Sequence, residues 1–255
     1  MYDEIYVVCG GSPTIRVYKA QEPFSRLDDV VVKEMKQPWD IAACWITRCL
    51  YMGDGKEECV WRVKICFGGG EMLVDKFIQR VVVWSVSVST DGHVAIVARR
   101  KDMVTCGISV YSPDGEITTV IDLEGYGLEQ ATRAVWTSTG SWLVFNGADD
   151  VALHCIHELT ADGHILDKYG GQPGSGDGQL KSPDHLALSD DGKQILVADS
   201  HNGRVLMLDR HPMRLKRVLL VIGGKPFRLY LMRPTDVTRR LIVSDMYSVA
   251  VYGLQ

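Results

Sequence analysis

A five-residue apolar phrase of the kind that ends a β-strand occurs six times along the chain, at residues 5–9, 50–54, 95–99, 142–146, 195–199 and 241–245. The last residues of successive phrases are 45, 45, 47, 53 and 46 positions apart. Short apolar runs that return at a period of this length are typical of radial arrays of small sheets. The spacing therefore predicts an all-β, six-bladed β-propeller whose function lies on one of its faces.

Strand patterns surround each phrase. An alternating apolar run follows it, a third strand comes next in most repeats, and a further strand precedes it from the second repeat onward. Asp-Gly pairs at 91–92, 114–115, 162–163 and 191–192 supply the turns. The predicted strands include 30–35, 76–81 and 134–138. We expect one propeller domain, residues 1–255, with NHL-like blades at about 1–36, 37–82, 83–130, 131–181, 182–224 and 225–255.

The two terminal repeats are short of strands. No strand pattern precedes Ile5, and none follows Tyr252. Either both terminal blades have three strands, or residues upstream of Met1 in a longer parent protein complete them. We favour the second interpretation, because unpaired strand edges promote association and closed rings normally remove them.

Composition narrows the class of protein. No run approaches the 18 apolar residues that favour a membrane span, and the first residues do not resemble a signal peptide. Seven cysteines, at positions 9, 44, 49, 59, 66, 106 and 155, form no Cys-x-x-Cys pair. Their odd number and scatter favour free thiols in a reducing compartment, so we expect a cytoplasmic protein. The net charge of −4 does not favour nucleic-acid binding by the whole chain, although residues 209–240 contain nine Lys or Arg and two Asp.

The fifth repeat carries a recognisable motif. A Gly-rich approach at 171–180 leads to Ser-Pro-Asp-His at 182–185, Val-Ala-Asp at 197–199 and Asn-Gly-Arg-Val at 202–205. This arrangement resembles the NHL repeat, and the second and sixth repeats resemble it more loosely. The resemblance implies a propeller like the one in tripartite-motif ubiquitin ligases, where it is the substrate- or RNA-recognition end. This chain has no Cys/His run spaced for a RING or B-box, so any ligase chemistry would lie outside it.

The residue at each phrase end has a structural interpretation. An Asp or Asn there can accept hydrogen bonds from the backbone of the following turn, which we expect for Asp54, Asn146, Asp199 and Asp245. The guanidinium of Arg204 can reach the same turn as Asp199. These residues are therefore expected to build blades and not to bind a partner.

Residues at the start of the first strand in each blade are the candidate binding set, because these positions should ring the pore entrance. Trp and Arg are the residue types that dominate binding hot spots. As alternatives, the two Trp pack between blades, and the two Arg form salt bridges to the Asp residues. The predicted contacts are Trp39, Asp40, Trp84, Arg133, Asp184, His185, Phe227 and Arg228.

Three functions follow from this set. The first is a non-enzymatic recognition module that binds a protein or peptide, and the alternative is single-stranded RNA stacked on the same aromatic residues. A metal-dependent propeller hydrolase or lyase is a second alternative. Asp40 and Asp184 are too few carboxylates for a calcium site, and His154 and His157 would point to opposite faces of a strand. We therefore expect no catalytic residue, metal or cofactor, and no membrane partner.

Overall fold

The computed structural model describes residues 4–65, 72–100, 106–123, 126, 128, 131–147, 153–232, 239–245 and 247–254. Their regular structure consists of 22 strands and one 3-10 helix, η1 (Ser200–Asn202), with no α-helix in this part of the chain. Every paired strand is antiparallel to its neighbour. Six sheets follow one another along the sequence, and contacts group them into two compact units.

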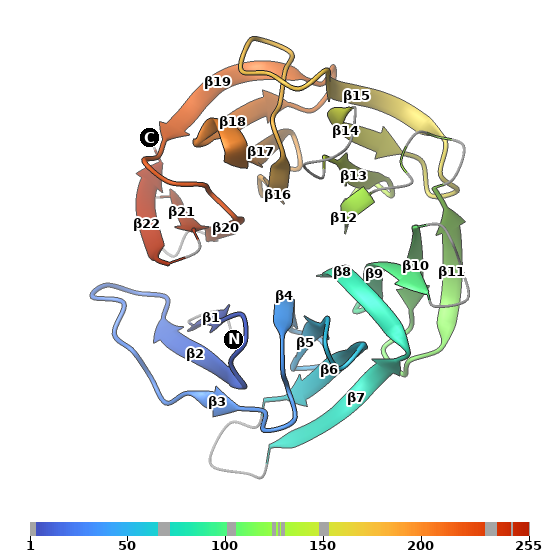
Figure 1. Ribbon diagram of the computed structural model, residues 1–255, viewed down its shortest axis with the longest axis vertical. Coiled ribbons are helices and arrows are strands. Elements are labelled where there is room, and N and C mark those ends of the chain that lie inside the picture. The colour runs from blue at the N-terminus through green and yellow to red at the C-terminus, as the bar shows by residue number, and fades with distance from the viewer. Residues whose placement is uncertain are drawn as a thin grey trace. The chain divides into compact units, whose positions relative to one another are not determined.

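The first unit comprises residues 1–124 and 134–136. Its first sheet has the order β1 (Glu4–Val8), β2 (Thr14–Lys19), β3 (Val30–Val31). The second has the order β4 (Pro38–Cys44), β5 (Cys49–Asp54), β6 (Cys59–Lys64), β7 (Leu73–Gln79). The third contains β8 (Val81–Val88), β9 (Val94–Arg100), β10 (Gly107–Tyr111) and β11 (Ile117–Asp122) in sequence order (Figure 1).

The second unit comprises residues 125–133 and 137–255. Its first sheet contains β12 (Ala131–Trp136), of which residues 134–136 group with the first unit, followed by β13 (Trp142–Asn146), β14 (His154–Leu159) and β15 (Ile165–Gly171). The next contains β16 (Pro183–Leu188), β17 (Gln194–Asp199), β18 (Arg204–Asp209) and β19 (Arg214–Val221). The last contains β20 (Arg228–Met232), β21 (Arg239–Ser244) and β22 (Val249–Leu254).

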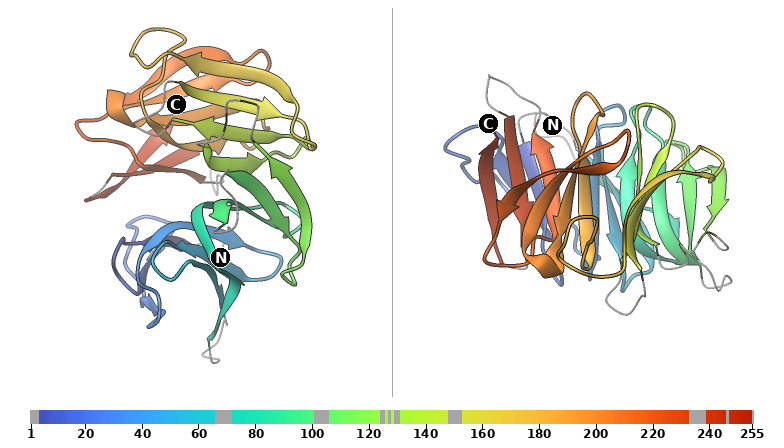
Figure 2. Two further views of the ribbon diagram at one scale, coloured as in Figure 1. Left: turned by 45° about the vertical axis from the view of Figure 1, so that its right-hand side comes forward. Right: turned by 90° about the horizontal axis from the view of Figure 1, so that it is seen from above.

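This succession of meander sheets is that of an all-β six-bladed β-propeller, as the repeat predicts. Each phrase forms the second strand of a four-stranded sheet, or its counterpart in a three-stranded one. Within each sheet the strands twist from the first to the last (Figure 2). Among the described residues the terminal sheets have three strands each, which are β1–β3 and β20–β22.

Three predicted strand limits were wrong for local reasons. The third strand of the first sheet spans two residues, because Val32 and Met35 form a turn through a backbone hydrogen bond of 3.0 Å. Val81 belongs to β8, since Arg80 has a φ of 60° that separates β7 from β8. Ser138 lies in the turn closed by the hydrogen bond from Gly140 N to Thr137 O, so β12 ends earlier than expected.

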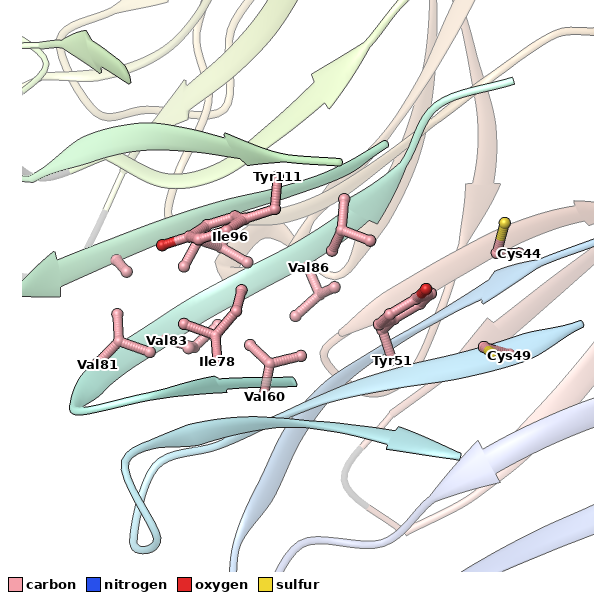
Figure 3. Packing of buried hydrophobic residues seen from close by; sticks show 12 residues of the cluster. Cys44, Cys49, Tyr51, Val60, Ile78, Val81, Val83, Val86, Ile96 and Tyr111 are labelled. Carbon is pink, nitrogen blue, oxygen red and sulfur yellow. The ribbon is translucent and has the colours of Figure 1, made fainter. Parts of the chain in front are cut away.

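The first unit is held together by apolar side chains between its second and third sheets. Val60 and Ile78 of one sheet face Val83 and Ile96 of the other, with Tyr111 at the side of the cluster (Figure 3). All five residues are buried. This packing positions β4 beside β8, the two strands that carry the Trp residues of the candidate site.

The six described cysteines are free thiols, and five of them are buried. Burial raises the pKa of Cys59 to about 12 and that of Cys155 to about 11, so neither thiol is ionised near neutral pH. Cys66 lies outside the described residues.

A membrane-crossing helix would need a long apolar span, and none of the helices formed by the described residues meets that requirement.

Candidate functional site

The phrase-end residue Asp54 organises the turn that follows it, as predicted. Asp54 is fully buried, and its carboxylate accepts hydrogen bonds from the backbone N–H groups of Lys36, Gln37, Lys56 and Glu57 at 2.7–3.1 Å. The indole of Trp61 donates a further bond of 3.2 Å. Burial alone would raise the pKa of Asp54, but the donors outweigh it and the pKa lies below its ordinary value.

The same role is confirmed at Asp245. Asp199 differs, because its donors in the described segment that follows are the side chains of Asn202 and Arg204 and not backbone N–H groups. Asp199 accepts the backbone N–H of Lys181 at 2.7 Å and forms a 2.7 Å ion pair with Arg204. Arg204 also donates to the carbonyls of Ser175 and Gln179 in the Gly-rich loop. Asp245 accepts the N–H groups of Tyr247 and Ser248, which lower its pKa. Asn146 differs, since its side-chain amide donates to Leu153 O at 3.5 Å.

The two Trp residues of the candidate set lie on β-bulges. In β4 the pairing register shifts between Pro38 and Asp40, and in β8 it shifts between Val83 and Ser85, so Trp39 and Trp84 are the extra residues. A bulge interrupts the alternation of a strand and redirects the side chain it inserts. Both indoles are 50% exposed, so half of each faces solvent even though the flanking residues are mostly buried.

Asp40 differs from its neighbour Trp39 in its exposure to solvent. It is buried, and its carboxylate accepts the backbone N–H of Val86 at 2.9 Å. This bond joins β4 to β8 one residue beyond Trp39 and two residues beyond Trp84. Asp40 therefore joins the two strands that carry Trp39 and Trp84, and as a buried residue it is not part of the exposed surface.

In the second unit a buried imidazole lies near two guanidinium groups. His185 on β16 accepts the backbone N–H of Leu229 at 3.3 Å through Nδ1, which joins β16 to β20. Burial lowers the pKa of His185 well below its ordinary value, and the charges of Arg133 and Arg228 lower it further. His185 and Arg133 are buried. His185 is therefore a neutral structural residue at neutral pH.

The part-exposed members of the second unit are Asp184, Phe227 and Arg228. Asp184 is the extra residue of a bulge between Pro183 and His185 in β16, the position that Trp39 occupies in β4. Tyr230, two residues beyond Arg228 on β20, shares its face and is 59% exposed. Tyr230 was not among the residues predicted from the sequence, although the period of two along a strand contains that signal.

The basic stretch is not a uniform solvated face. Arg214 and Lys216 form ion pairs with Asp209, at 3.6 and 3.3 Å. Arg210 is fully buried and forms a 2.6 Å ion pair with Glu158, also buried. Arg233, which belongs to the same basic stretch, lies outside the described residues.

The described residues contain no group of three His, Cys, Asp or Glu side chains arranged to hold a metal ion. His154 and His157 are both buried in β14. His154 Nδ1 accepts the backbone N–H of Ser182 at 2.6 Å, so it joins β14 to the segment that begins β16. Burial lowers the pKa of His157.

Comparison with known proteins supports the fold alone. No family model matches the chain, and no curated protein matches it. Solved structures do match over nearly its whole length. The crystal structure of a nidogen/laminin complex has a TM-score of 0.70 and 17% identity over 98% of this chain and 89% of that one.

Two further structures give the same result. Hydrazine synthase from Kuenenia stuttgartiensis has a TM-score of 0.68 and 13% identity, covering 99% of this chain and 92% of its own. An auxiliary nutrient binding protein from Bacteroides ovatus has a TM-score of 0.66 and 15% identity, covering 98% of this chain and 67% of its own. At these identities the shared feature is the six-bladed β-propeller class, and the NHL repeat is not assigned by any family model.

Proposed function

We propose that this protein is a non-enzymatic recognition module that binds a protein or peptide partner in the cytoplasm. The observation that carries the proposal is the pair of half-exposed indoles, Trp39 and Trp84, on adjacent bulged strands of the first unit. Trp is the residue most enriched among binding hot spots, and a large rigid side chain loses little conformational entropy on binding. The Asp40–Val86 bond joins the two strands that carry these indoles, which supports a fixed spacing of the two residues.

Asp184, Phe227, Arg228 and Tyr230 offer a second contact surface within the second unit. Arg228 donates to Phe227 O at 3.0 Å, and the charge of Arg228 suits an acidic side chain of the partner. The neighbouring folds are consistent with such a role but do not decide it. One was solved in a nidogen/laminin complex and another is called a nutrient binding protein, whereas a third is a synthase.

We do not extend the proposal to a tripartite-motif ubiquitin ligase, because no family model matches the chain. Single-stranded RNA is the competing ligand, since unpaired bases also stack on exposed indoles. The net charge of −4 disfavours it, because phosphate contacts normally supply much of the affinity for nucleic acid.

The test is a quantitative pull-down from cell extract with three forms of the protein. We compare the wild type, the double variant Trp39→Ala/Trp84→Ala, and Trp45→Ala, whose indole is 54% exposed at the other end of β4. Truncation of a hot-spot Trp weakens binding by about 2 kcal/mol or more, about 30-fold. The double variant should lose partners that Trp45→Ala retains.

Recovery of the same partners by all three forms would overturn the proposed surface. A titration with random single-stranded RNA at two salt concentrations separates the competing ligand. An affinity for RNA that falls steeply with salt and depends on Trp39 and Trp84 would identify single-stranded RNA, and not a peptide, as the ligand of this surface.

A further inference from the structure

A second apolar surface lies in the first unit, at the turn between β4 and β5. Trp45 and Ile46 form the tip of this turn and are 54% and 45% exposed. The equivalent turns of three other sheets are Ser-Thr-Asp-Gly-His at 89–93, Thr-Ser-Thr-Gly-Ser at 137–141 and Ser-Asp-Asp-Gly-Lys at 189–193. These three turns are polar, whereas the β4–β5 turn exposes apolar surface at its tip. Exposed apolar surface of this kind often marks a binding site.

A groove continues from this tip. It has a volume of about 290 Å³ and is lined by residues that include Thr47, Arg62, Lys64, Leu73 and Pro113. The Gly92 turn shows that the tip and the groove are adjacent. A Cβ at Gly92 would lie 3.5 Å from Pro113 Cγ and 3.7 Å from Ile46 Cγ2.

The wall of the groove is rigid. The guanidinium of Arg62 forms hydrogen bonds of 3.0 and 2.8 Å to Asp75 and one of 3.2 Å to Pro113 O. It also lies over the ring of Phe77, 5.0 Å from the centroid, and Tyr51 packs edge-on against that ring. A surface fixed in this way loses little entropy when a ligand binds.

The charge of the lining selects the ligand. Arg62 and Asp75 neutralise one another as an ion pair. Lys64 is exposed and forms no ion pair with a carboxylate among the described residues, so it leaves one positive charge beside an apolar surface. An acidic side chain next to an apolar one is the complement of this arrangement.

We propose that the groove beside the β4–β5 turn binds a short peptide segment that places an aliphatic or aromatic side chain against Trp45 and Ile46 and a carboxylate beside Lys64. Trp39 lies near the start of β4 and Trp45 directly follows its last residue, so the strand between them separates them by about 20 Å at a rise of about 3.3 Å per residue. The groove is therefore independent of the surface proposed above.

The experiment is selection of a random-peptide phage library on the folded wild-type chain, with affinities of the selected synthetic peptides measured by fluorescence anisotropy. Enriched peptides should pair an apolar residue with Asp or Glu within a few positions. Trp45→Ser and Lys64→Glu should each weaken them about tenfold or more. Val120→Ser, which removes an exposed apolar side chain of β11 in the same unit, should leave them unchanged.

Both test positions are exposed, so melting curves should match the wild type, and Lys64→Glu keeps the test valid if Trp45→Ser unfolds. Peptides that bind Trp45→Ser and Lys64→Glu as tightly as the wild type would overturn the proposal. So would a selection that enriches basic peptides, or none. These results are independent of the pull-down with the Trp39 and Trp84 variants.

Discussion

Removal of one partner from the buried Arg210–Glu158 pair should strongly destabilise the second unit. Nε and Nη2 of Arg210 donate to Glu158 at 3.2 and 2.6 Å, and both side chains are 1% exposed. Nη2 also donates to the hydroxyls of Thr139 and Ser141, at 2.7 and 2.8 Å. The perturbation is Arg210→Met, which keeps most of the volume and removes the charge and every donor.

The expected loss of stability follows from the Glu158 carboxylate, which stays buried after Arg210 is replaced. Without Arg210, the carboxylate of Glu158 stays buried beside the hydroxyl of Ser141, which donates at 2.7 Å, and the exposed imidazole of His211 at 3.8 Å. Breaking a buried ion pair from one side costs about 3–5 kcal/mol, because an uncompensated charge is left in the interior. At about 2–4 °C per kcal/mol for a chain of this size, Tm should fall by about 6–20 °C. The double variant Arg210→Met/Glu158→Leu removes both charges and should lie within about 2 kcal/mol of the wild type.

The assay is urea unfolding at pH 7 followed by tryptophan fluorescence and circular dichroism, with thermal melting of the same samples. The wild type, both single variants and the double variant complete a double-mutant cycle. A coupling of about 2 kcal/mol or more supports the interpretation. A single variant within about 1 kcal/mol of the wild type, or a double variant as unstable as the sum of the singles, would refute it.

Three further predictions concern the sites themselves. The pKa of His185 is lowered in the folded state, so as pH falls the unfolded chain takes up a proton at this residue before the folded chain does. The free energy of unfolding should therefore decrease below pH 6.5, by up to about 1.4 kcal/mol per pH unit. Urea midpoints from pH 7.5 to 5 should show this slope reduced in His185→Gln and unchanged in the exposed control His164→Gln; equal slopes in both variants would exclude His185 as the source. Asp54→Ala leaves several buried donors unsatisfied and should lower the free energy of unfolding by about 3 kcal/mol in urea titrations, whereas a change below about 1 kcal/mol would contradict its role in the turn. A Cβ at Gly55 would overlap the indole Nε1 of Trp39, so Gly55→Ala should displace that indole and weaken binding of the partner captured by the wild type in calorimetry; unchanged affinity would show that Trp39 does not contribute.

Much of the fold follows from local patterns. The phrase at 195–199 marks β17 because four consecutive apolar residues end at an Asp, and in the structure Asp199 accepts hydrogen bonds from the side chains of Asn202 and Arg204 after the strand. The first residue of β8 could not be predicted in this way. The break before Val81 depends on the positive φ of Arg80, a residue type that does not signal such a conformation.

The candidate site was predicted by position and not by environment. Trp39 and Asp40 are neighbours in the sequence, yet one is half-exposed and the other is buried, because a bulge breaks the alternation. A bulge is set by pairing with the adjacent strand, and its place does not show in the strand's own residues. The burial of Arg210 could not be predicted, because its partner, Glu158, is 52 residues away in the sequence.

The central claim is that Trp39 and Trp84 contact the partner. The most direct measurement is a ¹⁹F NMR titration of the full chain labelled with 5-fluorotryptophan, using a partner recovered by the wild type and lost by Trp39→Ala/Trp84→Ala. Single Trp→Phe variants assign the resonances, and Trp45 serves as the exposed internal control. We predict that the signals of Trp39 and Trp84 shift on saturation while that of Trp45 stays in place. A saturated complex in which the Trp39 and Trp84 signals do not move would contradict the account.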